Sequence, residues 1–289
     1  MHQFLQQVFS GIAVGAIYGS VALALVMIYR ATDLINFAQG EMAMFSTYIA
    51  WTLVNAGVPF WAAFVITLAV SFLGGMTLER IVIRPVENAP VLASVIVTIA
   101  LALIFNSLAG WIYSYTVQDF PSPFPDRPIL GALITTNDLG VIVVTLLMLG
   151  LLFAFFRFTS TGLAMRAAAQ NPVSARLCGI PVGRMLAIGW GLAAAIGATA
   201  GIMVAPVLFL DPYMMGGVLL YAFASALLGG INSPLGAVVG GLIVGVTENL
   251  VGTYLIASQL KLTVALVLII LVLVFKPHGL FGTGIVQRV

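Results

Sequence analysis

Apolar runs long enough to cross a membrane recur along the whole chain of 289 residues. A transmembrane helix needs about 20 mostly apolar residues, because its backbone polar groups must all be hydrogen-bonded within the segment. Charged residues make up only 7% of the sequence, against roughly 25% in soluble domains. The sequence therefore predicts an all-α fold, a polytopic helical membrane protein.

Polar or turn-forming junctions separate nine apolar segments. They lie roughly at 8–29, 37–56, 59–79, 91–114, 138–157, 185–209, 216–231, 234–256 and 260–275. The seventh segment is short and ends at Gly229-Gly230, so it is also compatible with a half-span that does not cross fully. We expect about nine spans in a single membrane domain covering residues 1–289.

Positive charges divide unequally when alternate connections are assigned to opposite sides of the membrane. One side receives nine of them, which are Arg30, Arg80, Arg84, Arg157, Arg166, Arg176, Arg184, Lys276 and Arg288. The other side receives Arg127 and Lys261, which completes the eleven. Because Lys and Arg favour the cytoplasmic side, we predict an external N-terminus, a cytoplasmic C-terminus and a cytoplasmic 159–184 segment.

The largest connection on the predicted outer side runs from 115 to 137. It contains four prolines, at positions 121, 123, 125 and 128. Proline lacks the N–H that a helix interior needs, so this density of prolines excludes helix. We expect an extended or hairpin-like cap.

A polar segment rich in Arg, residues 159–184, separates the fifth and sixth apolar segments. Its composition favours a helix from Leu163 to Gln170, a break at Asn171-Pro172 and a second short helical piece ending at Gly179. A short surface helix between two spans suits docking against a soluble partner. A solvated loop without such a role is the alternative that composition leaves open.

Small residues recur at helical spacing in the first, sixth and eighth segments. The three sets are Gly11, Gly15 and Gly19; Gly189, Ala193, Gly197 and Gly201; and Gly241, Gly245 and Gly252, with Glu248 on the same face. Such stripes let helix backbones approach closely, because packing joins helices in lipid. We favour packing within the chain, and contact with a second membrane subunit is the alternative.

Two carboxylates, Glu41 and Glu248, lie inside predicted spans. An ionisable group at membrane depth costs on the order of 3 kcal/mol unless it is paired or hydrated, so each marks a transport pathway or a helix-locking contact. Further polar side chains at membrane depth are Gln39, Asn106 and Ser107. We assign these three residues and Glu41 to a candidate pathway, and Glu248 to helix packing. A helix–helix hydrogen bond with no ligand role is the alternative for each.

Several kinds of chemistry find no support in the sequence. No Gly-Lys pair provides a phosphate-binding P-loop, and His2 and His278 stand at opposite ends of the chain. Cys178 is the only cysteine, and the Lys and Arg residues form no run that would bind nucleic acid. We therefore expect no enzyme activity, no catalytic residue, no cofactor, no metal site and no nucleic-acid partner.

Three groups of motifs narrow the function. They are residues 29–42; residues 162–167 with 178–180; and residues 228–241 with Glu248 and 276–282. Together they resemble the LivH-type permease of bacterial branched-chain amino-acid ABC importers, nearly from end to end. The chain departs from that family's usual pattern at Gln39, where His is typical, and at Lys276, where Arg is typical. The loss of a titratable group at position 39 argues against a proton-linked role there.

The resemblance implies a multi-pass protein of the bacterial inner membrane, surrounded by lipid, that imports leucine, isoleucine or valine. It implies four kinds of partner: a LivM-type second permease, two cytoplasmic ATP-binding subunits that carry the ATPase activity, and a periplasmic amino-acid binding protein. It also implies that the 159–184 segment couples to the ATPase. The coupling residues would be Leu163, Met165, Arg166, Ala167, Ala168 and Gly179. A urea or amide ABC permease, and a secondary transporter or channel acting alone, are the alternatives.

Overall fold

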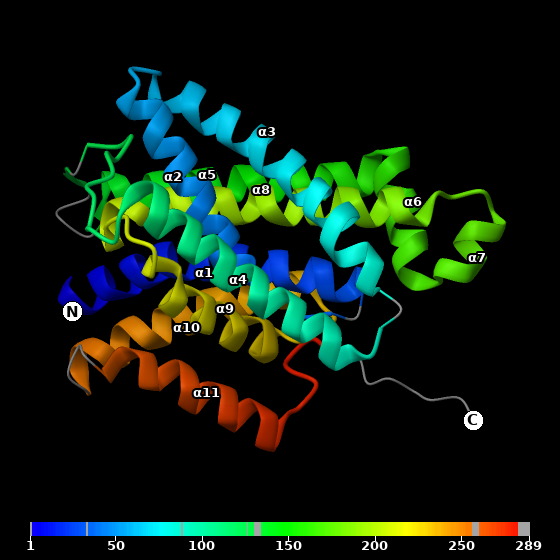
Figure 1. Cartoon of the computed structure of the whole chain (residues 1–289). Coiled ribbons are helices and arrows are strands. Elements are labelled where there is room, and N and C mark those ends of the chain that lie inside the picture. Colours follow the sequence, from blue (N-terminus) through cyan, green and yellow to red (C-terminus); the bar gives the residue numbers. More distant parts are fainter. Residues whose placement is uncertain are drawn as a thin grey trace. The chain divides into compact units, whose positions relative to one another are not determined.

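The computed structural model describes residues 2–32, 34–87, 89–125, 127–129, 134–255 and 260–282. Asp33, which belongs to the motif at residues 29–42, and Arg288 lie outside the described residues. The described part is almost entirely helical (Figure 1). Its α-helices are α1 (His2–Thr32), α2 (Gln39–Asn55), α3 (Phe60–Leu78), α4 (Val91–Tyr113), α5 (Thr136–Phe158), α6 (Ser160–Gln170), α7 (Pro172–Leu177), α8 (Val182–Leu208), α9 (Met214–Gly229), α10 (Pro234–Tyr254) and α11 (Lys261–Phe275). A π-helical turn, η1 (Glu79–Ile83), and a 3-10 turn, η2 (Arg84–Val86), follow α3.

Each of the nine predicted apolar segments overlaps one of these helices over most of its length, and the prediction of a polytopic helical membrane protein is confirmed. Within the described residues, six helical stretches are long and apolar enough to cross a membrane: α1, α3 with η1 and η2, α4, α5, α8 and α10. The apolar helices α9 and α11 are shorter, and α2 has 17 residues. Nine crossings therefore stay a prediction.

Proline and capping side chains set where several helices begin. Pro59, Pro90 and Pro181 directly precede α3, α4 and α8. At the start of α10, the Ser233 hydroxyl accepts a hydrogen bond from the Gly236 N–H at 3.0 Å. Pro234 occupies the first turn, where its missing N–H has no intrahelical partner to lose.

The chain divides into two compact units, each assembled from separate stretches. The first comprises residues 1–26, 124–143 and 216–289, and the second comprises residues 27–123 and 144–215. Helices α1, α5 and α9 contribute residues to both units.

The central helix of the second unit is α8, against which α2 and α3 pack. The most apolar stretch of α8 is 72% buried, compared with 22% for the α3 stretch and 17% for α4. Close packing on α8 depends on glycine, because a Cβ atom at Gly75 of α3 would lie 2.6 Å from the Trp190 carbonyl oxygen. The outer sides of α3 and α4 expose apolar side chains such as Leu73 and Leu103, as expected for helices that face lipid.

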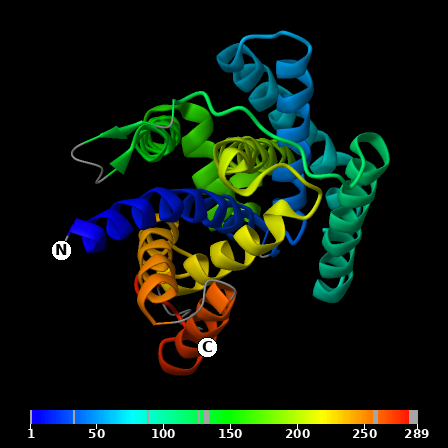
Figure 2. The same cartoon turned by 90° about the vertical axis from the view of Figure 1, so that its left-hand side faces the viewer.

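In the first unit the small-residue faces of α1 and α10 meet each other. A Cβ atom at Gly15 would lie 2.8 Å from the Gly241 carbonyl oxygen, and a Cβ atom at Gly11 would lie 2.8 Å from the Val246 Cα. Figure 2 shows the beginning of α1, in blue, running beside α10, in orange. Helix α11 packs on α10. The stripes of α1 and α10 are therefore used within the chain, which leaves no need for a second subunit to cover them.

The turn between α9 and α10 and the segment after α11 come together, although Leu228 and Leu280 are 52 positions apart in the sequence. The Leu280 N–H donates to the Leu228 carbonyl oxygen at 2.7 Å, and the Phe281 N–H donates to the Gly229 carbonyl oxygen at 3.0 Å. Gly230 has φ +107°, a conformation that disfavours side chains, and a Cβ atom there would lie 2.6 Å from the Gly282 nitrogen. The absence of a side chain at Gly230 thus lets the turn between α9 and α10 contact the segment after α11.

The described residues of the proline-rich connection form a short hairpin and no helix before α5 begins at Thr136. Strands β1 (Pro128–Ile129) and β2 (Ile134–Thr135) pair antiparallel, with Pro128 opposite Thr135. The expected extended or hairpin-like conformation is confirmed.

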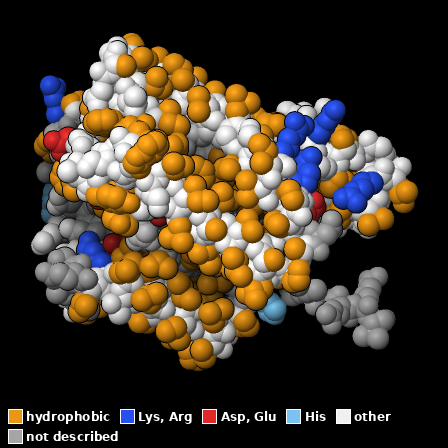
Figure 3. Space-filling view, viewed as in Figure 1, with side chains coloured by type: hydrophobic (Ala, Val, Ile, Leu, Met, Phe, Trp, Pro, Cys, Tyr) orange, Lys and Arg blue, Asp and Glu red, His pale blue; other side chains and the backbone are white. Residues whose placement is uncertain are grey.

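Exposed arginines concentrate at one end of the second unit. Figure 3 shows Lys and Arg side chains gathered beside α6 and α7, while hydrophobic side chains cover most of the rest of the visible face. The exposed arginines on the helices at this end are Arg80, Arg157, Arg166, Arg176 and Arg184. This distribution agrees with the grouping of positive charge on which the predicted orientation rests.

Candidate functional site

A polar contact inside the second unit joins α2, α4 and the connection between α8 and α9. The Asn106 side-chain amide donates to the Pro212 carbonyl oxygen at 2.6 Å and lies 3.5 Å from Glu41 Oε2. Glu41, Asn106 and Asp211, which precedes Pro212, are each partly exposed. The structure therefore brings two of the four predicted pathway residues into one cluster that ligands can reach.

Asp211 and Tyr48 belong to the same cluster. Asp211 is close enough to interact electrostatically with both Glu41 and Tyr48, and its own carboxylate accepts from the Tyr213 N–H at 2.6 Å. The Tyr48 ring is fully buried and stacks on Tyr113 with ring centroids 4.5 Å apart. The cluster thus holds two carboxylates and a phenol.

Gln39 lies apart from this cluster, between α2 and α8. It is fully buried, its amide nitrogen donates to the Ala193 carbonyl oxygen at 2.9 Å, and its amide oxygen accepts from Asn36 Nδ2 at 3.2 Å. A Cβ atom at Gly197 would lie 2.6 Å from the Gln39 nitrogen, so the glycine makes room for this contact. In this conformation Gln39 ties two helices together and presents no free polar atom to a pathway.

Ser107, the fourth predicted pathway residue, is exposed on α4. Successive helical residues point about 100° apart, so Ser107 does not share the direction in which Asn106 meets Pro212. The structure does not bring Ser107 into the cluster.

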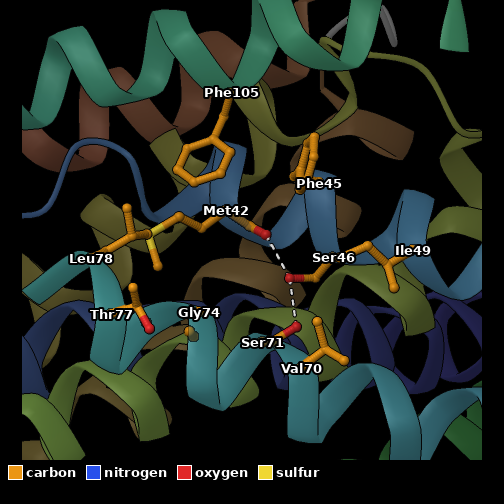
Figure 4. A pocket seen from close by; sticks show the side chains of 12 residues that line it. Met42, Phe45, Ser46, Ile49, Val70, Ser71, Gly74, Thr77, Leu78 and Phe105 are labelled. Atoms are coloured by element: carbon orange, nitrogen blue, oxygen red, sulfur yellow. Dashed lines mark hydrogen bonds between the residues drawn. The ribbon is translucent and has the colours of Figure 1, made fainter. Parts of the chain in front are cut away.

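A pocket of about 360 Å³ opens between α2, α3 and α4, beside the cluster. Figure 4 shows Met42, Phe45 and Phe105 on one side of it and residues of α3 on the other. The Ser71 hydroxyl donates to the Ser46 hydroxyl at 2.8 Å, which in turn donates to the Met42 carbonyl oxygen at 2.8 Å. Because these hydroxyls are already paired within the chain, the pocket suits an apolar group. Glu41 lies one turn before Phe45 on α2, so the polar cluster adjoins the aromatic wall of this pocket.

The 159–184 segment folds as the sequence predicted, into two short helices with a break between them. The Thr159 hydroxyl caps α6 by accepting from the Gly162 N–H at 2.9 Å. Asn171 ends α6 and caps α7, because its side-chain oxygen accepts from the Ser174 N–H at 2.9 Å. Gly179 follows in a left-handed conformation with φ +78°, which turns the chain toward α8.

The two faces of α6 have different roles. Met165 and Ala168 are buried, and Ala168 packs in a cluster with Val182 and Leu186 of α8. The expectation that Met165 and Ala168 contact a partner directly does not fit this geometry, because α8 of the same chain already occupies their side. Leu163 is exposed and Ala167 is partly exposed.

Apolar and positive side chains alternate on the outer surface of α6 and α7. Leu163, Val173 and Leu177 are 61%, 66% and 85% exposed, and Arg166 and Arg176 are exposed beside them. Exposed large apolar residues rimmed by charge are typical of protein interfaces. We call these five residues the outer coupling surface.

An ion pair lies in the turns that follow α3, and its arginine also bonds the start of α8. Arg84 donates to both oxygens of Glu79, at 3.1 and 2.7 Å, and to the Gly183 carbonyl oxygen at 2.6 Å. Glu79 is 2% exposed, and Arg84 is 38% exposed. From the sequence, Arg84 was identified only as one of the positive charges and not as a member of an ion pair. A Glu and an Arg five residues apart at the end of an apolar segment, Glu79 and Arg84, were the sequence feature that indicated this ion pair.

Glu248 locks helices of the first unit. The Tyr18 hydroxyl donates to Glu248 Oε2 at 2.9 Å, and the Tyr221 ring stacks on Tyr18 with ring centroids 4.6 Å apart. Gly241 and Gly245 on the same face approach α1. The arrangement makes Glu248 an acceptor for the Tyr18 phenol, which joins α10 to α1.

We expect Glu248→Gln to preserve most of the thermal stability of the purified protein and Glu248→Leu to lower it clearly. Gln keeps an acceptor for the Tyr18 hydroxyl, whereas Leu leaves this buried hydroxyl unpaired at a cost of about 1–3 kcal/mol. Unfolding temperatures in one detergent would measure the difference. Equal losses in the two variants would show that charge, and not hydrogen bonding, matters at this position.

Comparison with known proteins agrees with this architecture. Residues 7–274 match the protein family described as branched-chain amino acid transport system / permease component. The high-affinity branched-chain amino acid transport system permease protein LivH of Escherichia coli (strain K12) is 33% identical over 304 residues, covering 99% of this chain and 98% of that protein. The corresponding permease protein BraD of Pseudomonas aeruginosa is 30% identical and covers 100% of this chain and 99% of its own length.

A solved structure shares the fold. PsaBC from Streptococcus pneumoniae in complex with Fab aligns with a TM-score of 0.50 and 14% sequence identity, covering 94% of this chain and 91% of that chain. At this identity the similarity concerns the fold alone. The family match and the near full-length identity to LivH and BraD carry the assignment: the chain belongs to the family of permease components of branched-chain amino acid transport systems.

Proposed function

We propose that this chain is a transmembrane permease subunit of an ATP-driven importer of leucine, isoleucine and valine. The observation that carries the proposal is the end-to-end similarity to LivH and BraD, whose names state branched-chain amino acid transport. In this proposal a second permease of the LivM type completes the translocation path. Two cytoplasmic subunits hydrolyse ATP, and a periplasmic binding protein delivers the amino acid.

The proposed orientation places the N-terminus in the periplasm and the C-terminus in the cytoplasm of a bacterium. The unequal division of Lys and Arg between the two sides supports it. The exposed arginines beside α6 and α7 then lie in the cytoplasm, where the ATP-binding subunits are found.

The outer coupling surface is the proposed contact with an ATP-binding subunit. A short helix that lays apolar side chains into a groove is a common mode of recognition. Met165 and Ala168 transmit the movement, because they seat α6 on α8, the buried central helix of the second unit. The ion pair of Glu79 and Arg84 adds a second link from this end of α8 to α3.

The path fits an amino acid with an apolar side chain. Such a substrate needs apolar surroundings together with a few polar groups for its zwitterionic head. The pocket beside Phe45 and Phe105 supplies apolar walls of adequate size, and the cluster of Glu41 and Asn106 supplies the polar groups. Selectivity resides mainly in the binding protein, because a tight site in the membrane would slow release.

Uptake of labelled leucine and labelled urea by the reconstituted complex tests the substrate. Each assay uses the matching binding protein from the same gene cluster. We expect leucine to accumulate and urea to remain at the level of empty vesicles. Urea import without leucine import would overturn the proposed substrate and leave the membership of the permease family standing.

A further inference from the structure

Two carboxylates of the cluster share a region of the second unit without a positive partner. Among the described residues, the one ion pair is that of Arg84 with Glu79. Glu41 lies 3.5 Å from the Asn106 amide, and the Asp211 carboxylate accepts from the Tyr213 N–H. An unpaired charge at membrane depth costs on the order of 3 kcal/mol, and a second like charge nearby adds repulsion. A cation supplied from outside the chain would relieve both.

The buried hydroxyl of Tyr48 is a second and independent sign of a missing ligand. Tyr48 is fully buried, and its oxygen has no hydrogen-bond partner within the described part of the chain. It lies close enough to Asp211 to interact with that carboxylate electrostatically. A buried polar atom without a partner costs about 1–3 kcal/mol, so each such atom calls for an explanation. Thr67 Oγ1 and Trp190 Nε1 are also without a partner among the described residues, but Tyr48 is the one beside the carboxylates.

The surrounding side chains strengthen any charge interaction at this place. The rings of Phe45 and Phe105 line the pocket with their centroids 5.4 Å apart, and the rings of Tyr48 on α2 and Tyr113 on α4 stack on each other. Because aromatic neighbours exclude water, the local dielectric constant is lower than in solution and attraction between opposite charges is larger.

We propose that Glu41, Asp211 and the Pro212 carbonyl oxygen form a transient site for the α-ammonium group of the transported amino acid. An ammonium group has three N–H donors. Glu41 and the Pro212 carbonyl oxygen both lie against the Asn106 amide, and Asp211 directly precedes Pro212 in the chain. The Pro212 oxygen uses one lone pair for Asn106 and keeps a second one. The Tyr48 hydroxyl, a donor without a partner, is suited to the substrate carboxylate. This site rests on the proposed function, since it assumes a zwitterionic substrate.

The geometry also gives Asn106 a positioning role. Its amide holds the Pro212 carbonyl at 2.6 Å and so fixes the segment that carries Asp211 next to α2 and α4. At 3.5 Å its contact with Glu41 is weak, which leaves the Glu41 oxygens available to an incoming ammonium group.

The test replaces each carboxylate by an amide, which removes the negative charge and keeps the shape of the side chain. Glu41→Gln and Asp211→Asn are compared with Asp119→Asn, which alters an exposed carboxylate outside the cluster. Each variant is reconstituted as the full importer, its assembly is checked by size-exclusion chromatography, and leucine uptake is measured with and without sodium. We expect each cluster variant to lower the uptake rate at least about tenfold, since hydrogen bonds to charged groups are worth that much. Asp119→Asn should transport as the unchanged protein does, and sodium should make no difference.

Three results would overturn the site, and they separate its failure from that of the proposed function. Leucine uptake that stays within twofold in both cluster variants removes the site and leaves leucine import standing. Uptake by the unchanged protein that requires sodium, together with loss in the variants, assigns the carboxylates to a metal cation instead. Import of urea in place of leucine overturns the proposed function and this site together, because urea carries no ammonium group.

Discussion

Replacing Leu163 and Leu177 together by Glu is expected to lower ATP-driven leucine uptake roughly 30-fold, because truncation of central interface residues typically costs about 2 kcal/mol or more. Both side chains are exposed, at 61% and 85%, so the change leaves the packing of α6 on α8 intact. ATP hydrolysis by the assembled complex should become independent of the loaded binding protein. Uptake and ATPase activity are measured on the same vesicles.

The matched control for this variant is Val117→Glu. Val117 is also apolar and 63% exposed, but it belongs to the proline-rich connection on the predicted external side. Its replacement should leave coupling unchanged. Normal uptake in the Leu163/Leu177 variant, or an equal loss in the Val117 variant, would remove the outer coupling surface from the mechanism. Ala168→Glu is a poorer test, since burial of Ala168 against α8 would make it a folding defect.

Replacing Gly15 by Leu is expected to lower the free energy of unfolding by about 3 kcal/mol, at the upper end for overpacked sites. A Cβ atom at Gly15 would meet the backbone of α10, with the Gly241 oxygen at 2.8 Å and the Leu242 Cα at 2.9 Å. Backbone cannot rotate away as a flexible side chain can, so α1 and α10 must separate. The yield of folded protein and its unfolding temperature in detergent measure the effect.

Gly150→Leu provides the control for the glycine variant. Gly150 lies in α5, another apolar helix, and a Cβ atom there would meet nothing within 4 Å. This variant should be as stable as the unchanged protein. Equal unfolding temperatures for the two variants would show that close approach at Gly15 is not required. We expect Gly245→Leu to behave like Gly15→Leu, because Gly245 directly opposes Gly15.

Much of the helical architecture could be predicted from the sequence because it depends on local properties. Apolar runs fixed where helices occur, and Asn171-Pro172 fixed the break between α6 and α7 through capping and the missing proline N–H. The small-residue spacing of α1 and α10 indicated close packing. The number of membrane crossings could not be predicted from the sequence, because α2, α9 and α11 are near the lower limit of length for a span.

The polar sites were harder to predict because they depend on which segments meet in space. Asn106 and Glu41 stood out as polar groups at membrane depth. Their partner Pro212 contributes a backbone oxygen, which no sequence pattern reveals. Asp211 was overlooked, although a carboxylate followed by proline directly after a long apolar segment was a visible signal. Gln39 was assigned to the pathway from its polarity, but Gly197 lets it bond across to α8.

The buried and exposed faces of α6 also could not be predicted from the sequence. Composition predicted the helix but not which side α8 would cover. Apolar residues on a short amphipathic helix are equally suited to packing inside the chain and to contact with a partner. Only the structure separates Met165 and Ala168, which are buried, from Leu163, which is exposed.

The energy source of uptake tests the central claim most directly. The chain is reconstituted with its second permease and both ATP-binding subunits, ATP is sealed inside the vesicles, and the leucine-loaded binding protein is added outside. The account predicts leucine accumulation that requires internal ATP and persists when ionophores collapse the proton and sodium gradients. Leucine accumulation without ATP, driven by an ion gradient in vesicles containing this chain alone, would contradict the account and assign a secondary transporter.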